Sequence, residues 1–207
     1  MTRAPAWLRP AGLAFAALAA LLLLIGAPSI AAGRFPDPDD VLRLVQVRDL
    51  LAGQGWFDLT QHRLDAPGGG VAMHWSRLVD LPLAALVLVL APLFGQPLAE
   101  TAAAVAVPVL TFSCAVLLVG RLADRLCGPD TVLYACLALA LSVPVLSQVL
   151  PLRIDHHGWQ IVLALAALAG VLSRDAVRGG WLAGVALAAW LALGDSETAQ
   201  RKAARPR

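Results

Sequence analysis

Charged residues are scarce in this chain. Asp, Glu, Lys and Arg make up 14% of the 207 residues, whereas soluble domains carry about a quarter. The formal net charge is only +2, and no long basic run precedes the last dozen residues. Because a nucleic-acid-binding protein needs a basic patch or stripe, the sequence excludes nucleic acid as a partner.

Cysteine is also rare, with three residues at Cys114, Cys127 and Cys136. They have neither CxxC spacing nor the spacing of a zinc site, and they lie in or beside apolar segments. We therefore expect small buried side chains here, not a disulfide or a metal site. The sequence also has no internal repeat and no segment that resembles a separate soluble domain.

Apolar residues, by contrast, make up 59% of the chain and gather in long blocks. A transmembrane helix needs about 20 consecutive apolar residues. Blocks that meet this length, or reach it with flanking residues, lie at 11–32, 99–120, 131–150, 158–173 and 180–194. The sequence therefore predicts an all-α, polytopic transmembrane protein of about five spans. The first block is too long for a signal-peptide core, which favours an uncleaved signal anchor over a cleaved signal.

A shorter apolar segment at 81–94 decides the topology. It is broken by prolines and is shorter than a span, as is typical of a re-entrant or interfacial segment. Arg3 and Arg9 place the N-terminus in the cytoplasm. If 81–94 does not cross, the loops at 33–98 and 151–157 both face outward.

The positions of arginine favour this five-span topology. Without a crossing at 81–94, Arg121, Arg125, Arg174 and Arg178 all face the cytoplasm; with a crossing, they turn outward and the 151–157 loop turns inward. The basic tail at 195–207 opposes the five-span version, since it would then lie outside. Its composition changes abruptly after the last apolar block of 1–194. Our hypothesis is that this tail is not native and results from a frameshift or truncation.

Acidic residues open the long outer loop, 33–98. Asp37, Asp39 and Asp40 lie among prolines, ahead of an apolar helical stripe that ends at Gly53. Carboxylates in this position cap a helix and interact favourably with its N-terminus. Alternatively, one of them coordinates a divalent cation just outside the bilayer.

A second polar cluster, Asp155-His156-His157, lies in a short loop between two apolar blocks. Carboxylate and imidazole groups bind metals or transfer protons. Polar groups packed between spans are costly unless they have water or a partner, so they are candidates for function. The alternative is a solvated loop at the membrane interface. The two acidic clusters share a face only in the five-span topology.

Between these clusters lie polar residues that are candidates for binding an anionic or sugar ligand. The glycine run at 68–70 is no P-loop, because the Lys-Ser/Thr signature is missing. The sequence supports equally well the alternative that these residues are ordinary polar groups of a loop. They are His62, Arg63, His74, Trp75 and Arg77.

The order of these features resembles the N-terminal region of the catalytic subunit of oligosaccharyltransferases, which are membrane glycosyltransferases of the GT-C class. The single-subunit archaeal and bacterial enzymes are the most similar. The resemblance covers about residues 11–175. The motifs that carry it are the Asp-Asp pair at 39–40, Arg-Asp-Leu-Leu-Ala-Gly at 48–53, Trp-Ser-Arg-Leu-Val-Asp at 75–80 and Asp-His-His at 155–157.

The resemblance implies sugar transfer from a polyprenyl-(pyro)phosphate-linked donor to an acceptor on the outer, periplasmic face of a bacterial inner membrane. It implies a divalent metal, Mg²⁺ or Mn²⁺, that holds the donor, with Asp39 and Asp155 as the catalytic pair. The family's C-terminal acceptor-binding domain has no counterpart here, so the acceptor stays open. The implied metal ligands are Asp39, Asp40, Asp155 and His157, with Asp39 preferred to Asp40, and the donor-binding residues are His74, Trp75 and Arg77.

A second class of function also fits the composition. A non-catalytic polytopic membrane protein, either transporter-like or an assembly subunit, would need no metal. Transport has little support, because the sequence shows no inverted repeat and no charged residue deep within a span.

Overall fold

The computed structural model describes residues 5–73 and 75–194, and this part of the chain is mostly helical with almost no strand. The long elements are α1 (Leu8–Ala31), α2 (Pro38–Leu51), α3 (Asp80–Phe94), α4 (Gln96–Cys127), α7 (His157–Val171) and α8 (Ala176–Gly194). The short ones are β1 (Thr60–Gln61), η1 (Ala66–Gly68), β2 (Val71–Ala72), η2 (Arg77–Val79), η3 (Pro129–Thr131), α5 (Val132–Ala138), η4 (Leu139–Leu141) and α6 (Val143–Ser147). The two strands pair antiparallel within the loop that follows α2.

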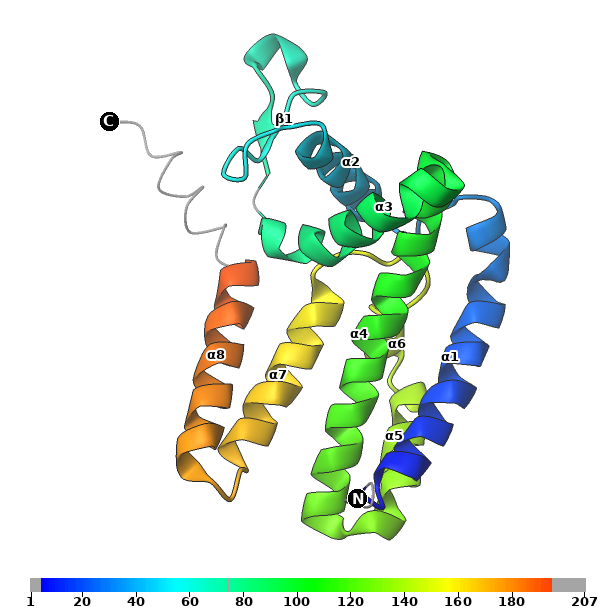
Figure 1. The fold of residues 1–207 in the computed structure, drawn as a ribbon, viewed down its shortest axis with the longest axis vertical. Helices are drawn as coiled ribbons and strands as arrows, with labels where there is room; N and C mark the ends of the chain where they lie inside the picture. Colours follow the sequence, from blue (N-terminus) through cyan, green and yellow to red (C-terminus); the bar gives the residue numbers. More distant parts are fainter. Residues whose placement is uncertain (1–4, 74, 195–207) are drawn as a thin grey trace.

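The long helices run lengthwise between two ends of the molecule (Figure 1). α1 and α4 run in opposite directions, α5 and α6 return beside them, and α7 and α8 form a closely packed antiparallel pair. We call the end that carries α2, β1 and β2 the loop end. The opposite end, where α1 begins and the α4–α5 and α7–α8 turns lie, is the turn end.

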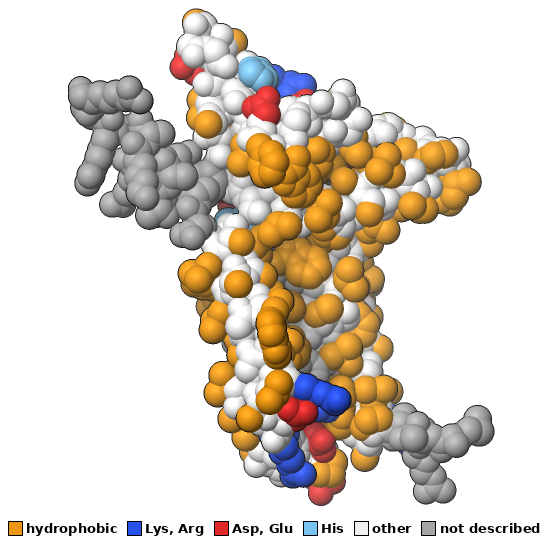
Figure 2. Space-filling view, turned by 60° about the vertical axis from the view of Figure 1, so that its left-hand side comes forward, with side chains coloured by type: hydrophobic (Ala, Val, Ile, Leu, Met, Phe, Trp, Pro, Cys, Tyr) orange, Lys and Arg blue, Asp and Glu red, His pale blue; other side chains and the backbone are white. Residues whose placement is uncertain are grey.

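The helices have the character of an integral membrane protein, as the sequence predicts. Among the described residues, four helical segments are long and apolar enough to cross a bilayer: Leu8–Ala31, Arg77–Phe94, Gln96–Cys127 and Ala176–Leu193. Two more apolar helical segments, Pro129–Leu141 and His157–Val171, are shorter. A broad apolar surface covers the face of the molecule seen in Figure 2, between its two ends. Such a surface suits contact with lipid.

α3 differs from the other apolar helices in its direction. It lies across the loop end of the bundle, although its length and composition suit a span (Figure 1). Consequently both acidic clusters lie at the loop end and both basic loops at the turn end. The five-span topology requires this arrangement; the number of spans itself stays a prediction.

The expected span at 131–150 is not one continuous helix. α5 ends at Ala138, a 3₁₀ turn follows, and α6 contains only Val143–Ser147. Pro144 cannot donate a backbone hydrogen bond to the preceding turn, and Ser142 before this segment leaves the helical region, with φ −91° and ψ 85°. The apolar composition of the segment gives no sign of this interruption.

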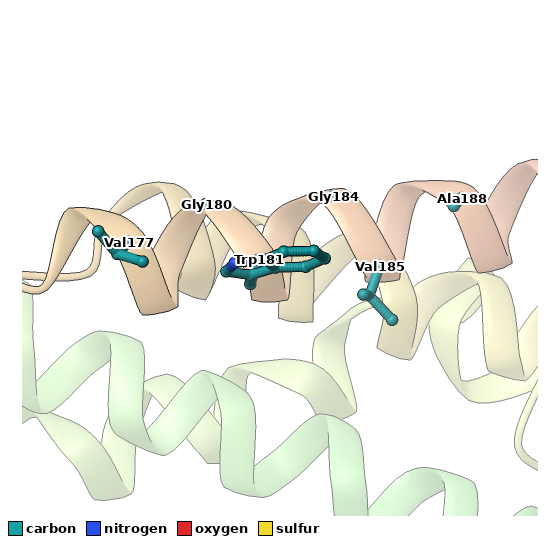
Figure 3. A pocket seen from close by; sticks show the side chains of 6 residues that line it. All are labelled: Val177, Gly180, Trp181, Gly184, Val185 and Ala188. Carbon is teal, nitrogen blue, oxygen red and sulfur yellow. The ribbon is translucent and has the colours of Figure 1, made fainter.

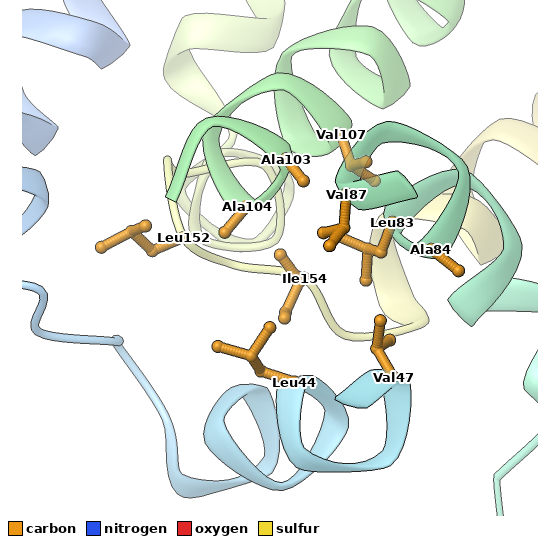
Figure 4. Close-up of a cluster of buried hydrophobic side chains, with 10 residues drawn as sticks. All are labelled: Leu44, Val47, Leu83, Ala84, Val87, Ala103, Ala104, Val107, Leu152 and Ile154. Carbon is orange, nitrogen blue, oxygen red and sulfur yellow. The ribbon is translucent and has the colours of Figure 1, made fainter. Parts of the chain in front are cut away.

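Two apolar clusters hold the helices together. The cluster at the loop end joins α2, α3, α4 and the chain before α7 (Figure 4), through Leu44, Val47, Leu83, Ala84, Val87, Ala103, Ala104, Val107, Leu152 and Ile154. The second joins α1, α4 and α5 and includes Phe112 and Cys136. The expectation of buried cysteines is right for Cys136, but Cys127 is exposed at the end of α4 and Cys114 is half-buried.

Candidate functional site

The second acidic motif lies at the loop end, where α7 begins. Asp155, His156 and His157 each offer one ligand atom, and these atoms lie within 4.8 Å of one another. Asp155 is buried, His156 is half-buried and His157 is exposed. We call these three residues the Asp-His-His group; its carboxylate is enclosed by protein, and its imidazoles lie toward solvent.

A proline in α4 helps to position the loop that carries this group. Pro108 has no N–H, so the carbonyl of Ala104, four residues earlier, lacks its helical partner. The N–H of Leu152 donates to that oxygen at 3.1 Å. Leu152 adopts a φ of 70°, a conformation that non-glycine residues rarely occupy. The free carbonyl in α4 therefore anchors a strained turn just before Asp155.

Gly158 brings the start of α7 close to α4. A Cβ at this position would lie 3.0 Å from the carbonyl oxygen of Gln148 and 3.1 Å from a side-chain carbon of Thr111. A larger residue would push α7 away from α4, so the glycine fixes where the Asp-His-His group sits.

Asp40 connects the first acidic motif to the second. Its side chain is buried, and Oδ1 accepts hydrogen bonds from the backbone N–H groups of Ile154, at 2.9 Å, and Asp155, at 3.1 Å. Its Oδ2 lies 3.1 Å from Nη1 of Arg153. Asp40 thus binds the backbone of the second motif directly, from 115 residues away in the sequence.

The two buried carboxylates have opposite pKa shifts. Burial raises the pKa of Asp40 to about 6, against the lowering effect of Arg153. Burial acts in the same direction on Asp155, but the hydrogen bond from His156 and the charge of Arg43 outweigh it, so the pKa of Asp155 falls below its usual range. Asp155 is therefore ionised at neutral pH, as a metal ligand must be.

A fully buried arginine links this site to α3. Nη1 of Arg43 donates to Oδ1 of Asp80 at 2.8 Å, and Nη2 donates to Oδ1 of Asp155 at 3.2 Å. The guanidinium also lies 5.0 Å from the ring centroid of Trp75, a cation–π distance. α2, α3 and the Asp155 loop therefore meet around one buried cation.

Sequence reasoning missed Arg43 and Asp80 as parts of the site. The sequence did contain a pattern that could have identified Arg43. Its spacing from Asp40, Leu44 and Val47 places all four residues on one face of a helix. A face that packs inward and carries two charges is a sign of a buried ionic network. Nothing in the local sequence identified Asp80 as the partner.

The imidazole of His157 lies between the side-chain amide of Gln160 and the carboxylate of Asp155. Its Nδ1 lies 3.1 Å from Oε1 of Gln160, and its Nε2 lies 3.4 Å from Oδ2 of Asp155. In the neutral ring, donation from Nδ1 to Gln160 leaves a lone pair on Nε2 facing the carboxylate. In that tautomer Nε2 and Oδ2 could hold a metal ion between them, whereas in the other tautomer Nε2 donates its own proton to Oδ2.

The donor set fits a divalent transition metal better than Mg²⁺. Mg²⁺ prefers oxygen ligands in near-ideal octahedral geometry, whereas imidazoles suit transition metals. Of the two predicted metals, Mn²⁺ is therefore the better match for one carboxylate and two imidazoles. Oδ1 of Asp155 already accepts from Arg43 and His156, so Oδ2 is its available ligand atom.

The other acidic residues of the first motif have different positions. Asp37 caps α2 by accepting a hydrogen bond from the N–H of Asp39 at 2.9 Å, so the capping interpretation is confirmed for Asp37. Asp39 itself is exposed in the first turn of α2 and is not part of the Asp-His-His group. The structure thus brings Asp40, the less favoured of the two predicted ligands, to the second motif. A role of Asp39 in metal binding stays a prediction.

Trp75 and Arg77 are built into the interior of the loop end, and His74 lies outside the described residues. Arg77 is buried and donates to the side chain of Gln54 and to backbone carbonyls of Gln46, Trp56 and Asp58. The indole N–H of Trp75 donates to the side chain of Gln46. Both residues fasten the loop after α2 to α2 itself, and their role in donor binding stays a prediction.

A hollow of about 400 Å³ opens beside His157. His157, Gln148 and Gln160 supply polar groups, and α7 and α8 supply an apolar wall that includes Ile161, Ala164 and Trp190. A ligand with a polar head and an apolar tail matches this lining. A larger hollow of about 590 Å³ along α8 is lined by Val177, Gly180, Trp181, Gly184, Val185 and Ala188 and contains no charged side chain (Figure 3).

Comparisons with known proteins add no family to this picture. No protein-family model, no curated protein and no solved structure matches the chain. The function is therefore inferred from the site residues themselves.

Proposed function

We propose that this chain is a membrane glycosyltransferase of the GT-C type, or part of one, that uses a polyprenyl-(pyro)phosphate-linked sugar donor at its loop end. The observation that carries the proposal is the direct contact of Asp40 with the backbone of Ile154 and Asp155. It joins the two acidic motifs that the resemblance requires at one site. The membrane is then a bacterial inner membrane, with the loop end facing the periplasm.

The residues take distinct roles in this proposal. Asp155, His156 and His157 hold a divalent metal, with Mn²⁺ preferred to Mg²⁺. Asp40 is a positioning residue, because it acts through the backbone of the second motif. Such a metal, when bound, neutralises charge on the leaving pyrophosphate of the donor.

The hollow beside His157 supports an amphipathic donor. Gln148, His157 and Gln160 offer hydrogen-bonding groups at its polar side, and Ile161 and Ala164 continue along α7 as an apolar wall. A polyprenyl chain can follow this wall into the bilayer while its phosphates stay near the imidazoles. Donor binding at this place leaves the sugar at the membrane surface, where an acceptor can reach it.

Metal binding is the first test of the proposal. The full chain in lipid nanodiscs is titrated with Mn²⁺ and followed by electron paramagnetic resonance. We expect Asp155→Ala and His157→Ala each to weaken Mn²⁺ binding at least tenfold, the scale of loss seen even for outer-shell partners of metal ligands. Asp130→Ala is the matched control, since it removes an exposed carboxylate at the turn end, away from both acidic motifs.

Donor binding is the second test. Undecaprenyl pyrophosphate should bind wild type in the presence of Mn²⁺ and lose affinity when the metal is chelated or His157 is replaced by Ala. If neither chelation of the metal nor His157→Ala changes the affinity for undecaprenyl pyrophosphate, the non-catalytic membrane protein is favoured instead.

The placement of the two ends can be tested by labelling. In a cysteine-free background, Asp65→Cys lies at the loop end and Asp130→Cys at the turn end, and both positions are exposed. A membrane-impermeant thiol reagent applied to intact cells should label position 65 and leave position 130 unlabelled. The reverse pattern would put the Asp-His-His group in the cytoplasm and remove the periplasmic assignment.

A further inference from the structure

A charged hollow lies at the turn end, at the opposite end of the bundle from the Asp-His-His group. It has a volume of about 540 Å³ and lies between the end of α4 and the α7–α8 turn. Figure 2 shows basic and acidic side chains gathered there, below the apolar sides of the molecule. We call it the basic hollow; its charged lining residues are Arg121, Asp124, Arg125, Arg174, Asp175 and Arg178.

The basic hollow carries an excess of positive charge. Four guanidinium groups face two carboxylates. Arg178 pairs with Asp175 at 3.3 Å. Within residues 5–73 and 75–194, Arg121, Arg125 and Arg174 have no ion pair and no side-chain hydrogen bond. Three guanidinium groups from two separate segments therefore converge on one hollow without a protein partner.

The surroundings of the hollow are those of a membrane interface. Large apolar side chains next to it are exposed on the helix sides, among them Leu126, Val171 and Val177. In a bilayer these side chains face acyl chains, so the guanidinium groups lie at the depth of the lipid phosphates. Arginine matches phosphate oxygens with two parallel hydrogen bonds, and basic pockets between transmembrane helices suit anionic headgroups.

We propose that the basic hollow binds the headgroup phosphate of an anionic phospholipid. Arg121 and Arg125 contact the phosphate from α4, and Arg174 contacts it from the α7–α8 turn. The acyl chains then lie along the exposed apolar sides of α4 and α7. A bound lipid would bridge two parts of the bundle that meet at the turn end without an ion pair between them.

The test is lipid retention by the full chain in detergent, measured by native mass spectrometry with added phosphatidylglycerol or phosphatidylcholine. Wild type should retain more phosphatidylglycerol than phosphatidylcholine. The double variant Arg121→Gln/Arg174→Gln should lose this preference by about fivefold for each arginine. The control is Arg9→Gln/Arg34→Gln, which removes the same charge from exposed residues that do not line the hollow.

A second variant tests the proposal in the opposite direction and does not depend on removing arginines. Asp124→Asn removes a carboxylate that repels phosphate, so it should raise phosphatidylglycerol retention. Equal loss in the control pair would mean that net charge alone attracts the lipid, and the hollow would then be no site. Stabilisation by inorganic phosphate without preference for phosphatidylglycerol would also overturn the lipid assignment, in favour of a soluble anion.

Discussion

The two ends of the molecule use arginine in opposite ways. At the loop end, Arg43 and Arg77 are buried, and Arg153 is largely buried between Asp37 and Asp40. At the turn end, Arg121 and Arg174 are exposed and have no partner among the described residues. The first set therefore depends on neighbouring carboxylates and carbonyls for its stability, whereas the second depends on solvent or lipid.

This difference separates arginines whose charge stabilises the fold from arginines whose charge can bind a ligand. A buried charge that loses its partner is strongly destabilising, whereas an exposed charge is easily removed. Substitutions of the buried arginines at the loop end should therefore unfold the molecule or disturb the Asp-His-His group. Substitutions at the turn end should change binding and leave the fold intact.

The largest effect is expected for Arg43→Met. This change leaves Asp80 and Asp155 buried without their shared cation, which should cost about 3–5 kcal/mol of unfolding free energy. The measurement is chemical unfolding in detergent. Arg125→Met at the turn end is the control and should leave the unfolding midpoint almost unchanged. If both variants lose the same unfolding free energy, arginines at the two ends do not differ in their contribution to stability.

The next effect is expected for Arg77→Met, which removes the donor to the carbonyls of Gln46, Trp56 and Asp58. Leaving buried acceptors unpaired should cost about 2 kcal/mol. Arg63→Met is a suitable control, because Arg63 is exposed and, among the residues that the structure describes, pairs only with Asp49. If Arg77→Met weakens undecaprenyl pyrophosphate binding without lowering stability, Arg77 is a donor-binding residue and not a structural one.

Asp40 should make stability depend on pH. Its folded-state pKa is about 6, against an ordinary value of 3.8, so the fold favours its protonated form. This contribution is complete below about pH 4 and is lost as the pH rises through 6. Between pH 4.5 and 7, wild type should therefore lose more thermal stability than Asp40→Asn, which has no titrating group. Asp39→Asn should show the same pH dependence of thermal stability as wild type. If wild type and Asp40→Asn also lose the same stability over this range, the pKa of Asp40 is not raised by burial.

Pro108→Ala should give the smallest effect. Alanine restores an N–H that competes with Leu152 for the carbonyl of Ala104, so the anchor of the second motif weakens by about 1 kcal/mol. Hydrogen exchange should become faster at residues 152–157, while exchange in α8 stays the same. No change in exchange at 152–157 would show that the contacts of Asp40 and Arg43 hold this loop without the bond from Leu152 to Ala104.

Local features of the sequence were good guides to local structure. The apolar blocks at 11–32, 99–120, 158–173 and 180–194 each became a single helix, whereas the block at 131–150 is interrupted. The stripe after the Asp-Asp pair became α2, which ends at Leu51, just before Gly53. The Asp-His-His group was also visible, because its three members are neighbours in the sequence. The closeness of its three side chains depends mostly on short-range geometry, which one loop is enough to provide.

Long-range choices were less visible. Asp39 and Asp40 are adjacent and chemically identical, yet only Asp40 faces the second motif, because the start of α2 directs it inward. Likewise, no pattern in the sequence links Arg43 to Asp80. Pairing of this kind depends on which helix faces meet, and apolar composition does not encode that.

The sequence by itself determined that this is a helical membrane protein with acidic clusters at two places, since hydropathy and residue type are properties of each segment alone. Only the tertiary structure decided that α3 lies across the bundle, that Asp40 holds the backbone at Asp155, and that Arg43 is the shared buried cation. The physical reason is that burial and ion pairing are properties of contacts between segments. Those contacts exist only once the helices have packed.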